Sequence, residues 1–349
     1  MKKNIVLLLL LLVTLLAFSA VQAETPTLNV LTYSSFAVSE EIIAAFEAEN
    51  QVKVQFIEGG DTPSIVNRAI LTKDAPIADV IVGINDGLLS RALEYEILDP
   101  YLSPLLVDIP AEYQLDPNFG ALPFDYGNVC LNYDTAYFSE NSLEVPASLA
   151  DLTDPKYKGL LVVENPTSSA PGQAFFLTTV AEYGEDGFAA YWNELLKNDV
   201  LIDNDWSTAY YTSFTAGGGD GPRPMVVSYD TSPAAVPFYA EEPMEEAPTA
   251  SILADGMCYH SVEFVGILKG SKNRALAEKF VDAMLDVSWQ EDLPGQMFVF
   301  PVNEKAVLPE IFAKFAIPAQ NPVSLESTLV EENYEKWLQI WNDEVLINY

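Results

Sequence analysis

Histidine, cysteine and basic side chains are all scarce in this chain. Its 349 residues include one histidine, two cysteines and 17 lysines and arginines, against 51 aspartates and glutamates, so the formal net charge is −34. So few nitrogen and sulfur ligands argue against a zinc site, and we predict no bound metal. An acidic surface repels nucleic acid and anionic lipid and favours cationic ligands. We therefore expect no nucleic-acid partner.

Motifs that carry catalysis are also missing. The sequence has no G-x-S-x-G nucleophile turn and no H-E-x-x-H pair. The glycine-rich stretch "AGGGDG" at 216–221 lacks the lysine and the spacing of a P-loop. His260 lies in a strand pattern, where a lone histidine is more often structural than catalytic. We predict no catalytic residue, no cofactor and no enzymatic activity, with an exported hydrolase as the alternative.

Only one apolar run is long, and it stands at the N-terminus. Lys2 and Lys3 precede the run at 5–18, and small residues follow it up to Ala23. This order is typical of a secretory signal peptide, and the run is too short for a comfortable membrane span. We predict a signal peptide at 1–23, cleavage near Ala23, and a periplasmic or secreted mature chain.

Strand and helix patterns alternate through the rest of the chain. Apolar stretches at 27–33 and 78–84 predict strands, and amphipathic stretches at 64–73 and 85–98 predict helices beside them. A second set of such units fills 159–230. This alternation indicates an α/β architecture with mostly parallel sheets.

Two long strand patterns, at 121–134 and 258–271, enclose the second set of units. A chain that leaves one lobe along the first strand and returns along the other forms two lobes joined by two crossing strands. We therefore predict a first lobe made of 24–124 and 262–349, and a second lobe made of 125–261.

The two cysteines, Cys130 and Cys258, both lie near these crossings. An even pair of cysteines in an exported chain favours a disulfide. A bond here would join adjacent strands beside the hinge. Two buried free thiols are the alternative.

Polar and aromatic residues gather where the predicted strands end. The stretch "VVSYDTSPAA" at 226–235 ends one strand with a phenol, a carboxylate and two hydroxyls. Ligands of open α/β sheets sit at the carboxyl ends of strands, so these residues would line a cleft between the lobes. Aromatic rings beside carboxylates suit a planar cationic ligand, through stacking and cation–π contact. The aromatic candidates are Tyr33, Tyr126, Trp206, Tyr210, Tyr211 and Tyr229, and the carboxylates are Asp61, Asp125 and Asp230.

Eight short stretches, in order along the mature chain, resemble the thiamine-binding members of the periplasmic solute-binding proteins, which deliver ligands to ABC importers. They are "LTYSSF" (31–36), "SIVNR" (64–68), "ADVIVGIND" (78–86), "PFDYG" (123–127), "NPTSSAPG" (165–172), "WSTAY" (206–210), "VSYDTSPA" (227–234) and "FPVN" (300–303). The resemblance implies a two-lobed periplasmic-binding-protein fold of type II, in which each lobe is a mostly parallel sheet flanked by helices. It also implies binding of thiamine, with or without phosphates, for delivery to a membrane permease. We expect a monomer.

The resemblance further implies which residues bind the ligand. The positions that match the family are Tyr33, Asp61, Tyr126, Ser168 or Ser169, Trp206 and Tyr229. Ser232, in the 226–235 stretch, is expected to bind the ligand or to orient Tyr229. Phe298 stands where the family has a tryptophan, and Ala235 stands where it has a stacking tyrosine, for which Tyr239 is the expected substitute. The stretch "CYHSVEF" resembles a form of the family with a paired cysteine, which implies the Cys130–Cys258 disulfide.

Two other ligand classes fit the same layout, because its nearest relatives include binders of ferric iron and of polyamines. Iron requires neighbouring tyrosines and an anion site. A polyamine requires several acids along an elongated cleft.

Overall fold

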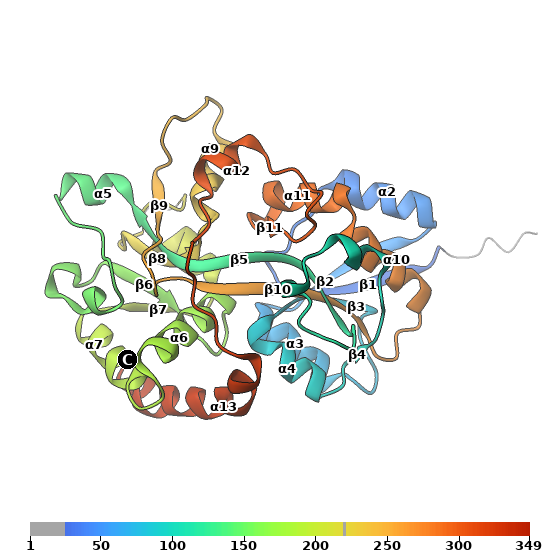
Figure 1. The fold of residues 1–349 in the computed structure, drawn as a ribbon, viewed down its shortest axis with the longest axis horizontal. Helices are drawn as coiled ribbons and strands as arrows, with labels where there is room; N and C mark the ends of the chain where they lie inside the picture. The colour runs from blue at the N-terminus through green and yellow to red at the C-terminus, as the bar shows by residue number, and fades with distance from the viewer. Residues whose placement is uncertain (1–24, 219–220) are drawn as a thin grey trace, which may run out of the picture.

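The computed structural model describes residues 25–218 and 221–349. The predicted signal peptide at 1–23 and its cleavage site lie outside these residues. Two halves stand side by side, and strands β5 (Ala121–Asp134) and β10 (Tyr259–Leu268) run through both of them (Figure 1). This is the two-lobed α/β fold that the sequence predicts, with two crossing strands between the lobes.

A single mixed sheet runs through the molecule, in the strand order β2-β1-β3-β10-β5-β8-β6-β7. The outer strands of each half are parallel to one another, whereas β5 and β10 are antiparallel to their neighbours. The remaining strands are β1 (Thr27–Thr32), β2 (Lys53–Glu58), β3 (Val80–Asn85), β4 (Leu98–Asp99), β6 (Leu161–Glu164), β7 (Leu201–Asp203), β8 (Met225–Tyr229), β9 (Thr249–Ile252) and β11 (Phe300–Pro301).

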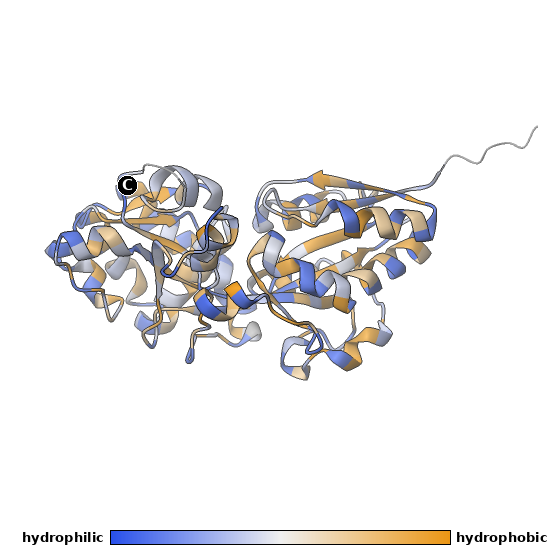
Figure 2. Cartoon of the chain, turned by 90° about the horizontal axis from the view of Figure 1, so that it is seen from above, coloured by the Kyte–Doolittle hydropathy of each residue, from blue (hydrophilic) through white to orange (hydrophobic). Residues whose placement is uncertain are grey.

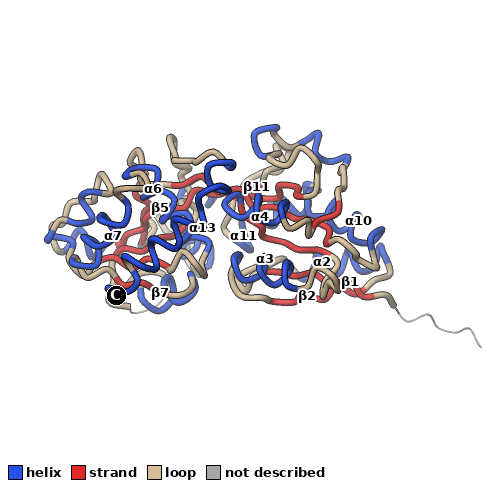
Figure 3. Tube along the Cα trace, turned by 90° about the horizontal axis from the view of Figure 1, so that it is seen from below, coloured by secondary structure: helices blue, strands red, loops and turns tan. Residues whose placement is uncertain are grey.

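Helices flank this sheet in both halves (Figure 3). Those of the first half are α2 (Glu40–Asn50), α3 (Thr62–Leu71), α4 (Asp86–Glu94), α10 (Arg274–Leu285) and α11 (Val287–Met297). The others are α5 (Thr135–Glu140), α6 (Ala170–Tyr183), α7 (Phe188–Lys197), α8 (Trp206–Thr208), α9 (Ala235–Tyr239), α12 (Glu310–Phe315) and α13 (Ser327–Glu344).

The pattern of apolar residues explains why the strands lie inside each half and the helices lie around them. Every residue of β3 is buried, as its continuous apolar sequence predicts for a strand covered on both faces. Helix α10 buries the positions that recur on one side of a helix, namely Ala277, Phe280, Val281, Met284 and Leu285. Figure 2 shows the result: apolar strands lie inside each half, and helices with mixed surfaces lie around them.

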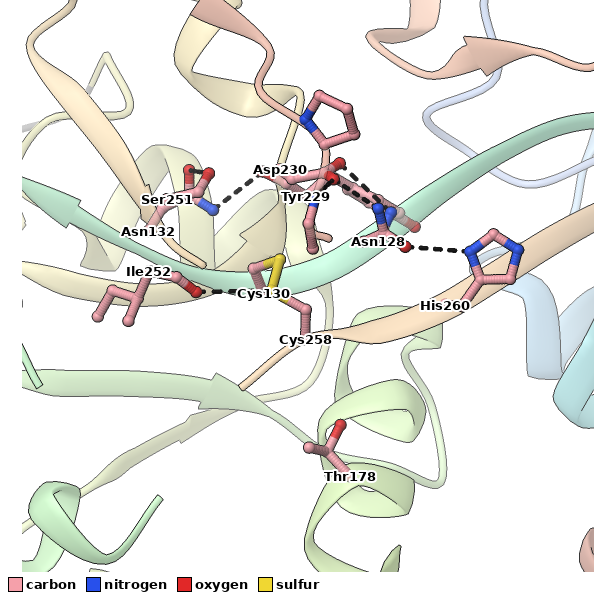
Figure 4. Close-up of a disulfide and its surroundings, with 12 residues drawn as sticks. Asn128, Cys130, Asn132, Thr178, Tyr229, Asp230, Ser251, Ile252, Cys258 and His260 are labelled. Atoms are coloured by element: carbon pink, nitrogen blue, oxygen red, sulfur yellow. Dashed lines mark hydrogen bonds between the residues drawn. A yellow bond between two sulfur atoms is a disulfide. The ribbon is translucent and has the colours of Figure 1, made fainter. Parts of the chain in front are cut away.

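The disulfide joins Cys130 in β5 to Cys258, which immediately precedes β10 (Figure 4). Val129 pairs with Tyr259 in the antiparallel ladder of these strands, so the two cysteines are close neighbours across the ladder. The bond closes a loop with a sequence separation of 128 residues. The predicted bond is therefore present beside the strands that join the lobes.

Helix α13 contacts both halves. Arg91 of α4 forms an ion pair with Glu335 on one side, and Trp192 of α7 packs edge-on against Trp341 on the other. The predicted boundaries of the lobes stay a prediction, and α13 is a further contact between the halves besides β5 and β10. Within the described ranges, no helix combines the length and the apolar character that crossing a membrane requires.

Candidate ligand-binding site

A cavity of about 660 Å³ lies where residues of both halves meet. Sites for small molecules commonly have volumes of about 300–1,000 Å³. The first half contributes Tyr33, Asp61 and Glu263 to the lining, and the second contributes Trp206 and Tyr229. Tyr33, Asp61 and Trp206 follow strands and Tyr229 ends one, as the strand-end argument predicts. Glu263 instead lies inside β10.

One wall of the cavity is a cluster of three rings. Trp206 stacks on Tyr210 with ring centroids 5.1 Å apart and an interplanar angle of 22°, and Tyr211 meets the indole edge-on at 5.4 Å. Asp205 caps the short helix by accepting a hydrogen bond from the Thr208 N–H at 2.8 Å. The cap fixes the start of the segment that carries the three rings.

A chain of hydroxyls holds the indole in place. The Trp206 Nε1–H donates to Ser228 Oγ at 2.9 Å, and Ser228 Oγ lies 2.8 Å from Ser232 Oγ. Ser232 Oγ also accepts a hydrogen bond from the Tyr229 backbone N–H at 3.2 Å. Ser232 therefore links the positions of Trp206 and Tyr229, and it also lines the cavity.

A second wall is built from Tyr239 and Phe298, whose ring centroids are 5.7 Å apart. Ala235 and Tyr239 both line the cavity, and they stand four residues apart in α9. A spacing of four residues places side chains on the same side of a helix. Tyr239 therefore presents a ring close to the place where Ala235 has none.

Two glycines make room for the tyrosines at the base of the cavity. A Cβ at Gly83 would lie 2.2 Å from the Tyr33 ring, and the φ of +97° at Gly83 is one that other residues rarely adopt. A Cβ at Gly127 would lie 3.1 Å from the Tyr229 ring. Both rings therefore depend on a glycine in a neighbouring strand.

Carboxylates surround these tyrosines. Burial raises the pKa of Asp61 to about 6, although the nearby Ser169 hydroxyl and Trp206 backbone N–H lower it. Burial also raises the pKa of Glu263 to about 7, and the hydrogen bond from the Tyr33 hydroxyl, at 2.9 Å, opposes that rise. No lysine, arginine or histidine is among the described residues that line the cavity. The site is therefore complementary to positive charge.

Residues 75–322 match the family model described as bacterial extracellular solute-binding protein. The chain belongs to this solute-binding family.

Two relatives and one solved structure are similar over nearly the whole chain. The thiamine-binding periplasmic proteins of Salmonella typhimurium and Escherichia coli are each 29% identical, over 94% and 90% of this chain and 96% and 92% of theirs. The structure titled "Periplasmic thiamin binding protein" superposes with a TM-score of 0.80 at 25% identity, and it covers 93% of this chain and 98% of that one.

Six of the nine residues predicted for the site of this solute-binding protein line the cavity. They are Tyr33, Asp61, Trp206, Tyr229, Ser232 and Phe298. The structure does not bring Tyr126 to it, because this ring stacks on Tyr113 at 4.8 Å and on Phe300 at 5.3 Å. Ser168 is half-buried outside the lining, and it donates to the Asn204 carbonyl at 2.6 Å. Ser169 is fully buried next to Asp61, behind the lining.

The lone histidine lies outside the lining. His260 Nδ1 is 3.0 Å from Asn128 Oδ1, and burial lowers the pKa of the imidazole (Figure 4). Among the described residues, no group of three His, Cys, Asp or Glu is placed to hold a metal ion.

The sequence prediction missed Glu263, which lies in the middle of the crossing strand β10. An acidic residue inside the otherwise apolar stretch "SVEFVGIL" was the available signal, because a buried charge without a partner usually serves a function. Glu164 in β6 and Asp125 in β5 show the same pattern of a buried acid within an apolar strand.

Proposed function

We propose that this solute-binding protein captures thiamine and presents it to the membrane permease of an ABC importer. The observation that carries the proposal is the cavity itself, which has seven aromatic side chains and two carboxylates but no basic side chain in its described lining. Thiamine is a cation with two flat aromatic rings joined by a methylene group, so it can both stack on such walls and neutralise such acids. Relatives named as thiamine-binding proteins support the same ligand.

In the proposed complex, each part of thiamine meets a different part of the lining. Trp206 and Tyr239 offer ring faces for stacking, and Tyr239 does so in place of a ring at position 235. Glu263 offers negative charge to the thiazolium. Asp61, once ionised, accepts a hydrogen bond from the aminopyrimidine. Each cation–π contact contributes about 0.5–2 kcal/mol.

Capture closes the two lobes about β5 and β10 over the ligand. The Asn85 Nδ2–H donates to Gln173 Oε1 at 2.8 Å, and this bond joins the end of β3 to helix α6 across the lobes. The Thr231 hydroxyl donates to the Phe298 carbonyl on another side of the cavity. Such contacts hold the closed state of the protein. The permease recognises the loaded protein in this closed state. We propose that the protein works as an exported monomer and breaks no bond in its ligand.

Ferric iron is the main rival ligand, since Tyr210 and Tyr211 are neighbouring tyrosines in the lining. Burial raises the pKa of both phenols, which opposes the phenolate form that binds iron. The described lining also offers no basic residue for the anion that would accompany the metal. Both features favour an organic cation.

A thermal-shift panel tests the proposal on the purified mature chain. Its ligands are thiamine, thiamine monophosphate, thiamine diphosphate, ferric iron and spermidine. A ligand that binds only the folded state raises the melting temperature, by an amount that grows with its concentration over Kd. We expect thiamine to give the largest shift. A larger shift with iron or spermidine, or an iron-dependent colour, would assign the site to the rival.

A further inference from the structure

Glu263 and Asp125 stand directly opposite one another in the antiparallel ladder of β10 and β5. Directly opposite residues in such a ladder put their side chains on the same face of the sheet, with Cβ atoms about 4.5–5.5 Å apart. Glu263 lines the cavity with 8% of its surface exposed, and Asp125 lies behind it with 1% exposed. The strands that join the lobes thus carry two adjacent carboxyl groups at the base of the cavity.

No basic side chain offsets this pair in the described part of the chain. Neither carboxylate forms an ion pair. Glu263 accepts one hydrogen bond, from Tyr33, and both carboxylate oxygens of Asp125 are buried without a hydrogen-bond partner. The other titratable groups that act on the pair are all acids or phenols, namely Tyr33, Tyr229, Asp61 and Asp86. Two buried carboxylates this close cannot both be ionised unless a cation joins them.

We propose that the Glu263–Asp125 pair recognises the positive charge of the ligand by exchanging a proton for it. The empty pair shares one proton, and the arriving cation expels that proton to solvent and takes its place beside Glu263. The inference rests on the proposed function, because it names the charge on thiamine as the group recognised. Glu263 contacts the ligand, whereas Asp125 acts as a positioning residue through Glu263.

The protonation of the empty pair supports this exchange. Burial first, and the charge of Glu263 second, raise the pKa of Asp125 well above its ordinary value. With the pKa of Glu263 raised to about 7, the empty pair still holds its proton near neutral pH. A cation that displaces the proton therefore binds more tightly as the pH rises from 6 to 8, and a neutral ligand gains nothing from the exchange.

Calorimetry of thiamine binding to the mature chain measures the exchange directly. Titrations at pH 7 in two buffers with different ionisation enthalpies give the number of protons released. We expect about half a proton at pH 7, because the Glu263 pKa lies near that value, and more at pH 6. A neutral analogue, with carbon in place of the thiazolium nitrogen, should release none and bind at least about tenfold more weakly.

Two variants and a control identify the groups responsible. E263Q keeps an oxygen that can accept from Tyr33, and it should lose the proton release and most of the preference for thiamine over the neutral analogue. D125N should reduce the release at pH 7, because it leaves Glu263 without the second carboxyl group across the ladder with which it shares the proton. D230N is the control: Asp230 is a buried acid bonded to Asn128 at 2.6 Å, outside the lining, and its loss should leave the release unchanged.

The possible results separate the two proposals. Thiamine binding without proton release, or with release that survives in E263Q, would overturn the exchange and leave the proposed function standing. No thiamine binding by the wild-type protein would overturn both.

Discussion

Replacing Trp206 with alanine should weaken thiamine binding by about 10–100-fold. The indole forms one wall of the cavity, stacks on Tyr210 at 5.1 Å, and is held by a hydrogen bond to Ser228. Truncation removes a ring face that the proposed ligand contacts. It leaves no buried hydroxyl without a partner, because Ser228 Oγ stays 2.8 Å from Ser232 Oγ.

The magnitude follows from these contacts. A cation–π contact contributes about 0.5–2 kcal/mol, and the loss of the stacked neighbour frees Tyr210 to move within the wall. An aromatic pair contributes about 0.5–1.5 kcal/mol, so the two losses sum to about 1–3.5 kcal/mol. A 10–100-fold loss, or about 1.4–2.8 kcal/mol, is the middle of this range, because each 1.4 kcal/mol is a tenfold change in Kd. Trp206→Phe keeps a ring face but loses the Nε1–H donor, so its effect should be smaller, under about fivefold.

Titration calorimetry with thiamine measures both variants against the wild-type protein. Tyr95→Ala is the matched control, since Tyr95 is a partly exposed aromatic residue outside the cavity lining. Its affinity should equal that of the wild type. If Trp206→Ala binds thiamine within about twofold of the wild type, Trp206 does not contact the ligand and the proposed stacking is wrong.

Three further outcomes follow from the same contacts. Replacing both Cys130 and Cys258 with serine should lower the free energy of unfolding, measured in urea, by about 2–5 kcal/mol, because the disulfide closes a loop of 128 residues. An unchanged urea midpoint would contradict this. The empty protein should be more stable at pH 5 than at pH 7, by about 2 kcal/mol from Glu263 alone. The reason is that a carboxyl pKa raised to about 7 makes the folded chain bind more protons than the unfolded chain between these pH values. A free energy of unfolding that rises from pH 5 to pH 7 would refute this prediction. Thiamine diphosphate should bind at least about tenfold more weakly than thiamine in calorimetry, since the described lining has two carboxylates and no basic side chain. Equal affinities would show that the phosphates avoid these acids.

Much of the fold could be predicted from the sequence because local patterns and long-range pairing agree in it. The apolar run of β3 and the amphipathic α10 each take the structure that their period predicts. The length of β5 and β10 identified them as the connection between the lobes, and the cysteines near them are bonded. The continuity of one sheet through both lobes could not be predicted, because it depends on which strands pair with β5 and β10.

The site was predictable where a residue's place follows from the end of its strand or helix. Tyr33 and Tyr229 lie at strand ends, Asp61 stands immediately before α3, and all three reach the cavity. Tyr126 stands inside β5, where its direction depends on strand register, and it packs on Tyr113 instead. Glu263 was missed for the same reason, because it stands inside β10, where strand register decides which way the side chain points.

The central claim is that an aromatic cation is held between aromatic walls above buried carboxylates, and one titration tests it most directly. Thiamine should bind the purified mature chain saturably, with one site per chain and a Kd below about 1 µM, which corresponds to roughly 8 kcal/mol. No saturable binding at thiamine concentrations up to about 1 mM, or roughly 4 kcal/mol, would contradict the account.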